Sequence, residues 1–354
     1  MQLAHELLSF FNDGYNDGSS FRPFSLMQFV EKNKEIVSGV YKITHYCKKL
    51  EQEGLLDHMG RTGDHPFFGH HYYTNKRFYN PDLSIYGSYD LLVNGFSAVR
   101  ERFKETCLAI SVLQQDDEYS IGSSFVYNHD TIITARHCLE GHKSFKLLDF
   151  SGNSIPIEDI YFSIDTQLDL AVLKTSKNYF HSLPVHALPP KPEHIGNTPT
   201  DDVNIIGAPS VVYFGVGKVL DDIITLGYPP IAGFESILIA DKSSINSVLL
   251  RSSIGQVLSE EKKYYGDIEY LLMNAKVKGG NSGGPVFDRK GRVIGIVVEI
   301  SADFKNPELI DKLGYGIIIP SRYIKDLLVA IQNGDELAVK VKVQPVGEDS
   351  YKLA

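Results

Sequence analysis

The stretch Val277-Lys-Gly-Gly-Asn-Ser-Gly-Gly-Pro-Val-Phe-Asp288 places one serine on a turn built from glycines, directly before a short apolar strand. Acyl transfer needs a hydroxyl that attacks and backbone N–H groups aimed at the oxyanion that forms. The pattern predicts Ser282 as the nucleophile and the N–H groups of Gly280, Asn281 and Ser282 as the oxyanion donors. An ordinary glycine-rich turn between two strands is the alternative, and other parts of the chain must decide.

The composition limits the classes of protein to which this chain can belong. Hydrophobic residues make up 43% and charged residues 22% of the 354 residues, as in ordinary soluble globular proteins. This length allows about two domains, each with its own core. The formal net charge is −9, and the charges balance over positions 1–104, so the acidic excess lies in the remainder. A polynucleotide would therefore have to bind a local basic patch.

The cysteines and the N-terminus favour a location in the cytoplasm. Three cysteines, at 47, 107 and 138, are too few and too scattered for a disulfide framework and lack metal-ligand spacing. No apolar run approaches the ~18–20 residues that span a bilayer, and the first residues do not have the pattern of a signal peptide. We expect a cytoplasmic protein with reduced thiols, no metal, no cofactor and no membrane contact.

Residues 1–78 carry three helical patterns and then a returning strand. Apolar residues recur at helical spacing from about positions 3, 26 and 40, Ser25 is a favourable N-cap for the second helix, and Gly54 ends the third. A polar loop and a predicted strand at 71–74 follow. This order, with the run Lys-Lys-Leu-Glu-Gln-Glu-Gly-Leu-Leu at 48–56, resembles a winged helix-turn-helix domain.

The winged-helix resemblance implies that the third helix and the loop after it, the wing, form a contact surface. Both carry groups that suit phosphate binding, and we predict a nucleic-acid or partner face composed of Lys42, His45, Lys48, Lys49 and Arg61. Because the charges of this region balance, contact with a partner protein or a second copy stays open. Histidines at 58, 65, 70 and 71 lie in or beside the wing without the regular spacing of a zinc finger, so we expect no metal there.

Beyond the winged-helix region the pattern changes. Residues 79–104 contain an Asn-Pro pair, two glycines and a short amphipathic pattern at 96–103, which predict a linker and a lead-in helix. From residue 105 short strands alternate with turns. Strands are predicted near 108–113, 121–127, 131–138, 168–173, 203–206, 223–226, 268–272, 292–298 and 314–320. A helix at 322–332 ends this region at about residue 333, and residues 334–354 are a C-terminal strand and tail.

Four short blocks occur in this second region: Gly-Ser-Ser-Phe-Val (122–126), Thr-Ala-Arg-His-Cys (134–138), Asp-Leu-Ala-Val-Leu (169–173) and Gly-Asn-Ser-Gly-Gly-Pro (280–285). They resemble the characteristic blocks of trypsin-like serine peptidases with the chymotrypsin fold, in the family's order of His, Asp and Ser. The resemblance covers about residues 105–333. It implies an all-β peptidase domain of two β-barrels, which follows the α-rich winged-helix domain.

Carried over position by position, the resemblance makes His137 the general base, Asp169 the residue that orients the imidazole, and Ser282 the nucleophile. The N–H groups of Gly280 and Ser282 would form the oxyanion hole. Asn281 stands where secreted digestive members have an aspartate that pairs with a new N-terminus. The chain therefore resembles bacterial members, such as the Deg/HtrA and glutamyl-endopeptidase groups, that need no activation cut.

Two further expectations follow from the same resemblance. Cys138 stands where the family often has half of a disulfide, with the partner position near Ile121, and it is expected to be a small buried thiol. The primary substrate pocket would be lined by Lys276, Val277, Lys278, Val298, Glu299 and Ile300. A lysine at the pocket would favour an acidic substrate side chain, unless both lysines point to solvent.

The sequence thus predicts a serine endopeptidase that hydrolyses protein substrates through a Ser-His-Asp triad and an acyl-enzyme. A winged-helix module would regulate the peptidase or recruit its substrates. The alternative is a DNA-binding regulator whose peptidase domain acts as a sensor or scaffold.

Overall fold

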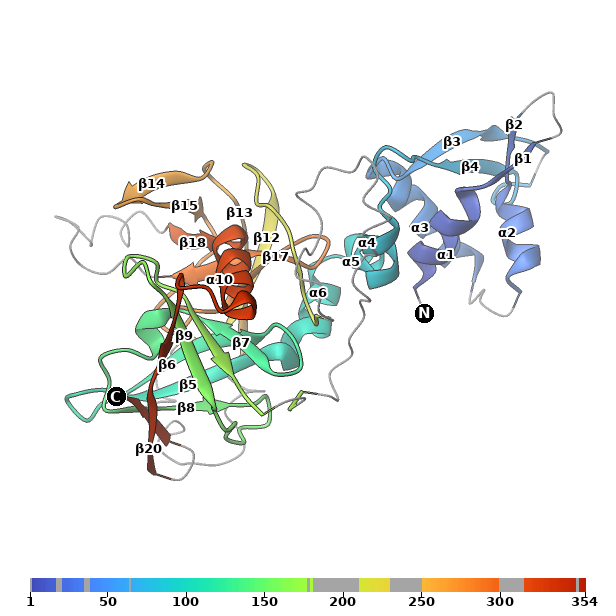
Figure 1. Ribbon diagram of the computed structural model, residues 1–354. Coiled ribbons are helices and arrows are strands. Elements are labelled where there is room, and N and C mark those ends of the chain that lie inside the picture. The colour runs from blue at the N-terminus through green and yellow to red at the C-terminus, as the bar shows by residue number, and fades with distance from the viewer. Residues whose placement is uncertain are drawn as a thin grey trace. The chain divides into compact units, whose positions relative to one another are not determined.

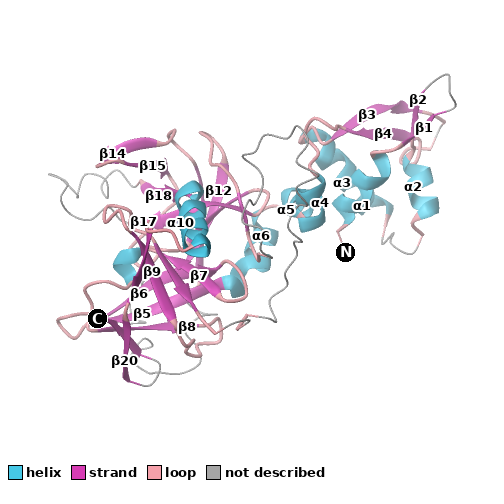
Figure 2. Cartoon of the chain, viewed as in Figure 1, coloured by secondary structure: helices cyan, strands magenta, loops and turns pink. Residues whose placement is uncertain are grey.

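The computed structural model describes residues 2–16, 21–34, 39–63, 65–176, 179–180, 210–229, 250–298, 315–347 and 350–354. The chain forms two compact units, Met1–Gly95 and Phe96–Ala354, drawn along the chain in Figure 1 and by type of secondary structure in Figure 2. None of the described helices combines the length and the apolar character that crossing a bilayer requires.

The first unit consists of helices and two small antiparallel strand pairs, β1 with β2 and β3 with β4. A bridge between Ser25 and His71 attaches the start of α2 to β4. Its elements in chain order are α1 (Leu3–Phe11), β1 (Gly14–Asn16), β2 (Phe21–Pro23), α2 (Leu26–Lys32), α3 (Val40–Gln52), β3 (Leu56–Arg61), β4 (His70–Thr74), α4 (Pro81–Tyr86) and α5 (Ser88–Asn94).

The three predicted helices share one apolar core. Leu7, Phe29 and Leu50 come from α1, α2 and α3 respectively, and each is fully buried. Ser25 begins α2 with a capping box: its hydroxyl accepts the N–H of Gln28, and the Gln28 side chain accepts the N–H of Ser25. The cap and the apolar stripes are local signals, which is why these helices are visible in the sequence.

Two short helices, α4 and α5, occupy much of the segment that was predicted as a linker over 79–104. Asn80 caps α4 through its side-chain oxygen, and Gly87, in the left-handed region at φ 86°, separates α4 from α5. Tyr89 and Leu92 of α5 are buried in the core of the first unit. Asp90 accepts the N–H of Ala4 at 3.1 Å. The first unit therefore extends to Gly95 rather than ending at residue 78, because helices of six and seven residues are too short to show a clear period.

The second unit contains two sheets and two α-helices of its own among the described residues. These elements are α6 (Phe96–Phe103), β5 (Cys107–Leu113), β6 (Tyr119–Val126), β7 (Thr131–Thr134), β8 (Ser144–Leu148), β9 (Asp159–Ser163), β10 (Ala171–Lys174), β11 (Tyr213–Phe214), β12 (Asp222–Gly227), β13 (Arg251–Gln256), β14 (Lys262–Tyr265), β15 (Ile268–Met273), β16 (Pro285–Asp288), β17 (Arg292–Val298), β18 (Gly316–Pro320), α10 (Ser321–Asn333), β19 (Ala338–Val341), β20 (Val343–Gly347) and β21 (Ser350–Leu353). The strand predicted at 203–206 lies outside the described residues.

The first sheet is almost closed by the C-terminal strands. Its order is β19-β9-β10-β7-β6-β5-β8-β21-β20, so β19 extends the edge at β9 and β21 extends the edge at β8. Only Lys342 separates β19 from β20 along the chain, so the two edges of the sheet come back towards each other. The hydroxyl of Tyr351 accepts the N–H of Ile157 at 3.1 Å and ties this segment to the sheet.

The second sheet also curves back on itself. Its order is β13-β12-β16-β17-β18-β15-β14, and β11 pairs in parallel with β17 beside this path. A bridge between Val257, just after β13, and Met273 of β15 joins strands near opposite ends of the sheet. The apolar side chains of Ile223, Leu271 and Ile294 fill its interior. The domain is therefore built from curved, nearly closed antiparallel sheets.

Helix α6 is anchored to the second sheet by an aromatic pair. The rings of Phe103 and Phe287 are stacked, with centroids 4.4 Å apart and planes 13° apart, and both side chains are fully buried. Phe287 belongs to β16, the strand that directly follows the glycine-rich turn. The pair links the start of the second unit to β16, the strand that directly follows the turn of Ser282.

We expect Phe103→Ala to lower the free energy of unfolding of the second unit by about 3–5 kcal/mol, because it removes a large buried ring and leaves a cavity. Hydrogen exchange at the amides of β16 and β17 would report the change, and Phe103→Leu should cost clearly less. Amides of α1 and α3 serve as the internal control. Unchanged exchange in β16 and β17 would contradict the anchoring role of α6.

Candidate active site

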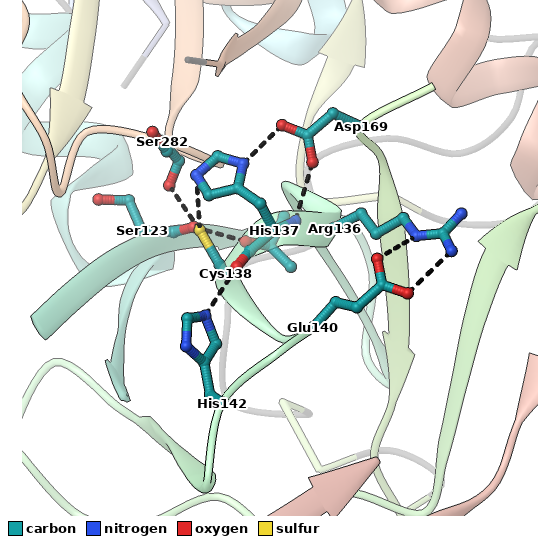
Figure 3. Close-up of polar contacts among 9 residues, drawn as sticks. Ser123, Arg136, His137, Cys138, Glu140, His142, Asp169 and Ser282 are labelled. Carbon is teal, nitrogen blue, oxygen red and sulfur yellow. Dashed lines mark hydrogen bonds and ion pairs between the residues drawn. The ribbon is translucent and has the colours of Figure 1, made fainter. Parts of the chain in front are cut away.

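Asp169 holds His137 through two hydrogen bonds. The backbone N–H of His137 donates to Oδ1 of Asp169 at 2.8 Å, and Nδ1 of the imidazole lies 2.6 Å from Oδ2 (Figure 3). His137 lies in a short 3₁₀ turn after β7, and Asp169 lies just before β10. These strands are paired, with Ala171 opposite Thr134, so their register brings the two residues together. With Nδ1 as the donor, the neutral ring has its free lone pair on Nε2.

The environment of His137 favours the charged imidazolium. Burial lowers the pKa of the imidazole, whereas the hydrogen bond to Asp169 and the neighbouring Cys138 raise it, and the net shift is upward. The His137 side chain is 41% exposed, so the site remains open to solvent and to a ligand. A ring that is oriented by a carboxylate and binds a proton more readily than usual is suited to accept one.

Ser282 lies in the second of two successive tight turns. The N–H of Asn281 donates to the carbonyl of Lys278 at 3.0 Å, and the N–H of Gly284 donates to the carbonyl of Asn281 at 2.9 Å. The third residue of each turn is a glycine with positive φ: 89° at Gly280 and 83° at Gly283. A positive φ at the third position is the mark of a type II turn and favours glycine.

Close packing excludes any side chain at these two glycines. A Cβ at position 280 would lie 2.5 Å from the carbonyl oxygen of Tyr228, and a Cβ at 283 would lie 2.2 Å from that of Ser123. Both contacts are with backbone atoms, which cannot move aside easily. The glycine-rich motif therefore has a steric cause as well as a conformational one.

The turns correct one part of the sequence prediction. Asn281 was expected to supply an oxyanion donor, but its N–H closes the first turn and its side-chain amide donates to the same Lys278 carbonyl at 3.0 Å. Within the described residues, the N–H groups of Gly280 and Ser282 have no acceptor. Two free donors, one on each side of Asn281, remain next to the serine.

Cys138 lies between the imidazole and the serine backbone. Its Sγ is 3.8 Å from Nε2 of His137 and 3.5 Å from the carbonyl oxygen of Ser282. Both contacts are drawn as dashed lines in Figure 3. It is a free thiol and only 5% exposed, as predicted. A Cβ at Gly122 would lie 2.8 Å from this sulfur, so the position that faces Cys138 is a glycine. In the part of the chain that the structure describes, no hydrogen bond joins Oγ of Ser282 directly to Nε2.

The predicted substrate-pocket residues divide into two groups. Lys276 and Lys278 are exposed, whereas Val277 is partly buried and Val298 is 4% exposed at the end of β17. Val298 pairs with Ile317 of β18, and a Cβ at the neighbouring Gly316 would lie 2.8 Å from Cγ2 of Val277. The two valines thus lie near the same end of β18, where Val298 is buried and Val277 partly buried. Glu299 and Ile300 lie outside the described residues.

The residues predicted for the face of the first unit mostly lie at its surface. Lys42, His45 and Lys48 are exposed along α3, Lys49 is partly buried, and Arg61 is exposed at the end of β3. His58 and His70 contact each other across the hairpin, with Nε2 and Nδ1 2.8 Å apart. Among the described residues no group of three or more His, Cys, Asp or Glu side chains could hold a metal ion.

Comparison with known proteins decides the family of the second unit. Residues 122–296, which contain His137, Asp169 and Ser282, match the family model of the trypsin-like peptidase domain. This chain carries a trypsin-like peptidase domain. The matched range begins in β6 and ends in β17, so the peptidase domain spans both sheets, and the resemblance seen in the four sequence blocks is confirmed.

Two curated relatives of the trypsin-like peptidase domain are bacterial. The serine protease Do-like HtrA of Bacillus subtilis is 25% identical over 220 residues, which cover 60% of this chain and 39% of that protein. The putative serine protease HhoB of a Synechocystis species is 29% identical over 208 residues, which cover 57% and 38%. The chain spans about two fifths of the length of the curated relatives it matches.

Solved structures show partial similarity to the peptidase domain. An HtrA-type protease with a tripeptide is 16% identical, with a TM-score of 0.45, and the match covers 71% of this chain and 66% of that one. The active form of a protease from M. tuberculosis is 20% identical, with a TM-score of 0.42, and covers 70% and 86%.

We expect Asp169→Asn to lower the pKa of His137, because the variant removes the negative charge and the acceptor that stabilise the imidazolium. NMR titration of the imidazole in both proteins would measure this. In the wild type the folded-state pKa lies above the unfolded value of about 6.5. The pair therefore contributes stability that is complete below that value and is lost as the pH rises through the folded pKa. An unchanged pKa in Asp169→Asn would contradict this coupling.

Proposed function

We propose that this protein is a serine endopeptidase that uses Ser282, His137 and Asp169 as a catalytic triad. The observation that carries the proposal is the arrangement around Ser282. An imidazole held at Nδ1 by a carboxylate has its Nε2 beside Cys138, which in turn contacts the carbonyl of Ser282. The N–H groups of Gly280 and of Ser282 itself, on either side of Asn281, have no acceptor among the described residues. Acyl transfer needs a base, a nucleophile and oxyanion donors at one point, and this arrangement supplies all three.

In the proposed reaction Nε2 of His137 removes the proton from Oγ of Ser282 as Oγ attacks the scissile carbonyl. The N–H groups of Gly280 and Ser282 donate to the oxyanion. His137 then protonates the leaving amine, which leaves an acyl-enzyme. Water, activated by the same imidazole, attacks the ester, and the acid product departs as Ser282 regains its proton.

The absence of a direct hydrogen bond between Oγ and Nε2 in the described residues is compatible with this route. Catalytic hydrogen bonds in ligand-free sites are often long or poorly aligned and shorten when substrate binds. A rotation about the Cα–Cβ bond of Ser282 moves only the hydroxyl and leaves both turns intact. The exposed side of His137 provides the room for a peptide to enter.

We expect Ser282→Ala to abolish hydrolysis of an unfolded protein such as β-casein and labelling by a fluorophosphonate probe, because it removes the nucleophile. Loss of the corresponding serine in another serine protease costs about 10⁶-fold in kcat. Ser252→Ala, at an exposed position of β13, is the matched control and should retain both activities. Labelling of Ser282→Ala at the wild-type rate would exclude Ser282 as the nucleophile.

We also propose that the first unit is a winged-helix module that regulates the peptidase or recruits its substrates. The order α1, α2, α3 and the β3–β4 hairpin supports this assignment. On α3 the exposed Lys42, His45 and Lys48 lie one helical turn apart, beside Tyr41, whose side chain is 79% exposed. In the described part of the chain neither lysine forms an ion pair, so both are free to meet phosphates. This face favours the second candidate function, a DNA-binding regulator whose peptidase domain acts as a sensor.

If α3 binds DNA, the double variant Lys42→Ala with Lys48→Ala should weaken binding and reduce the slope of log K against log [salt] by about two, since each lost phosphate contact releases about one counterion fewer. Gel shifts at several salt concentrations with a mixed-sequence duplex would measure this. Lys32→Ala on α2 is the control. No binding by the wild type even at low salt would remove the DNA candidate and favour contact with a protein.

The three cysteines support the expectation of a reducing compartment such as the cytoplasm. Cys47, Cys107 and Cys138 are all free and buried. We propose that the protein needs no disulfide for its fold, in accord with its cysteine spacing.

A further inference from the structure

Ser123 is a fully buried serine of the first sheet whose polar groups all contact the nucleophile turn or its surroundings. It belongs to β6, in the block Gly-Ser-Ser-Phe-Val that lies far from the turn in sequence. Its N–H donates to the carbonyl of Ser282 at 2.9 Å, and its own carbonyl accepts the hydroxyl of Thr134 at 2.7 Å. Its Oγ donates to the carbonyl of Gly280 at 2.6 Å and accepts the N–H of Tyr228 at 2.9 Å.

Two of these contacts hold peptide groups that adjoin the two free donors. The peptide between Gly280 and Asn281 is held at its carbonyl by Ser123 Oγ and at its N–H by the Lys278 carbonyl. The peptide after Ser282 is held at its carbonyl by the N–H of Ser123. The N–H of Ser282 projects from the backbone between these fixed points, and the N–H of Gly280 lies one peptide before the first of them. Hydrogen bonds from a different sheet therefore fix, together with the bonds within the turn, the backbone that carries both donors.

The turn needs such support because it is built from glycine. Glycine adopts both signs of φ at little cost, so Gly280 by itself does not keep its N–H turned in one direction. In the part of the chain that the structure describes, the donor to the Gly280 carbonyl is the Ser123 hydroxyl, and the surroundings are closely packed. A Cβ at Gly227 would lie 2.9 Å from Ser123 Oγ, and a Cβ at Gly284 would lie 3.3 Å from Ser123 Cβ.

We propose that Ser123 is a positioning residue that keeps the oxyanion-binding turn in its active geometry. This inference rests on the peptidase function proposed above. Ser123 touches neither the substrate carbonyl nor the His137–Asp169 pair in its proposed role, and it acts through the Gly280 peptide. When its hydroxyl is removed, the partly buried Gly280 carbonyl has no other donor among the described residues. Rotation of that peptide towards another donor changes the backbone angles beside it and so misdirects the adjoining N–H groups.

The expected result for Ser123→Ala is a fall in kcat of about 10- to 100-fold with little change in KM, somewhat less than the 10²–10³-fold that loss of a whole oxyanion donor costs. The substrate is a fluorogenic peptide taken from a site that the wild type cleaves in β-casein. The aldehyde of the same peptide, which forms a tetrahedral adduct with an oxyanion, should lose affinity by a factor similar to the loss in kcat. The pKa of His137, followed by NMR, should not change, whereas general damage to the site would shift it.

Ser124→Ala is the matched control. Ser124 is the next residue on β6 and is equally buried, but its hydroxyl donates to the carbonyl of Leu108 within the first sheet at 3.3 Å. The kcat of the Ser124→Ala variant and its affinity for the peptide aldehyde should stay at the wild-type level. Ser123→Cys retains a weaker donor at the same place and should fall between wild type and Ser123→Ala. If Ser123→Ala does not fold, the same measurements on Ser123→Cys decide whether Ser123 positions the turn.

The outcomes separate this inference from the function on which it rests. Wild-type kcat and aldehyde affinity in the folded Ser123 variants would overturn the positioning role and leave the peptidase assignment intact. An equal loss in Ser124→Ala would also overturn it, because the effect would then come from packing of β6. If the wild type neither cleaves β-casein nor reacts with a fluorophosphonate at Ser282, the peptidase function itself fails.

Discussion

The hydrogen bonds that join the two sheets at Ser123 and Ser282 are the constraint on which the site depends. His137 and Asp169 follow and precede paired strands of the first sheet, whereas Ser282 leads into the second. The relative position of the two sheets therefore decides whether the imidazole and the hydroxyl meet. The donors and acceptors at this junction are buried, and a buried polar group that loses its partner costs about 1–3 kcal/mol. A small displacement of one sheet would break several such bonds at once, so the alignment is well defined.

The second constraint is the backbone of the turn itself. Gly280 and Gly283 hold positive φ angles, and backbone atoms of neighbouring segments occupy the space where their side chains would lie. Asn281 between them uses its N–H, its carbonyl and its side-chain amide to close the turns. Because the Asn281 amide is neutral, it closes these turns without needing a charged partner. The asparagine therefore accounts for a turn that is formed without pairing to a free N-terminus.

Local features of the fold could be predicted from the sequence. The predictions that failed did so for identifiable physical reasons. The N-cap at Ser25, the glycine at 54 and the strand periods around β5, β6, β12 and β17 depend on neighbouring residues, and they were predicted close to their observed places. Helices α4 and α5 are too short to show a period. Strand β20 pairs with β21 and β21 pairs with β8, and no local pattern reveals these partners. The exposure of Lys276 and Lys278 likewise depends on the packing of Val277 against the core beside them.

By itself the sequence determined the order of chemical groups: a histidine after one strand, an aspartate before another, and a serine among glycines. Those residue types at those places are enough to indicate a trypsin-like peptidase domain, because each block carries its own local signal. The tertiary structure alone decided which backbone groups are free and which are used. It showed that Asn281 closes a turn, that the N–H groups of Gly280 and Ser282 have no acceptor among the residues the structure describes, and that a serine of the opposite sheet holds that turn. Hydrogen-bond partners across sheets depend on three-dimensional proximity, which a linear pattern of residues does not specify.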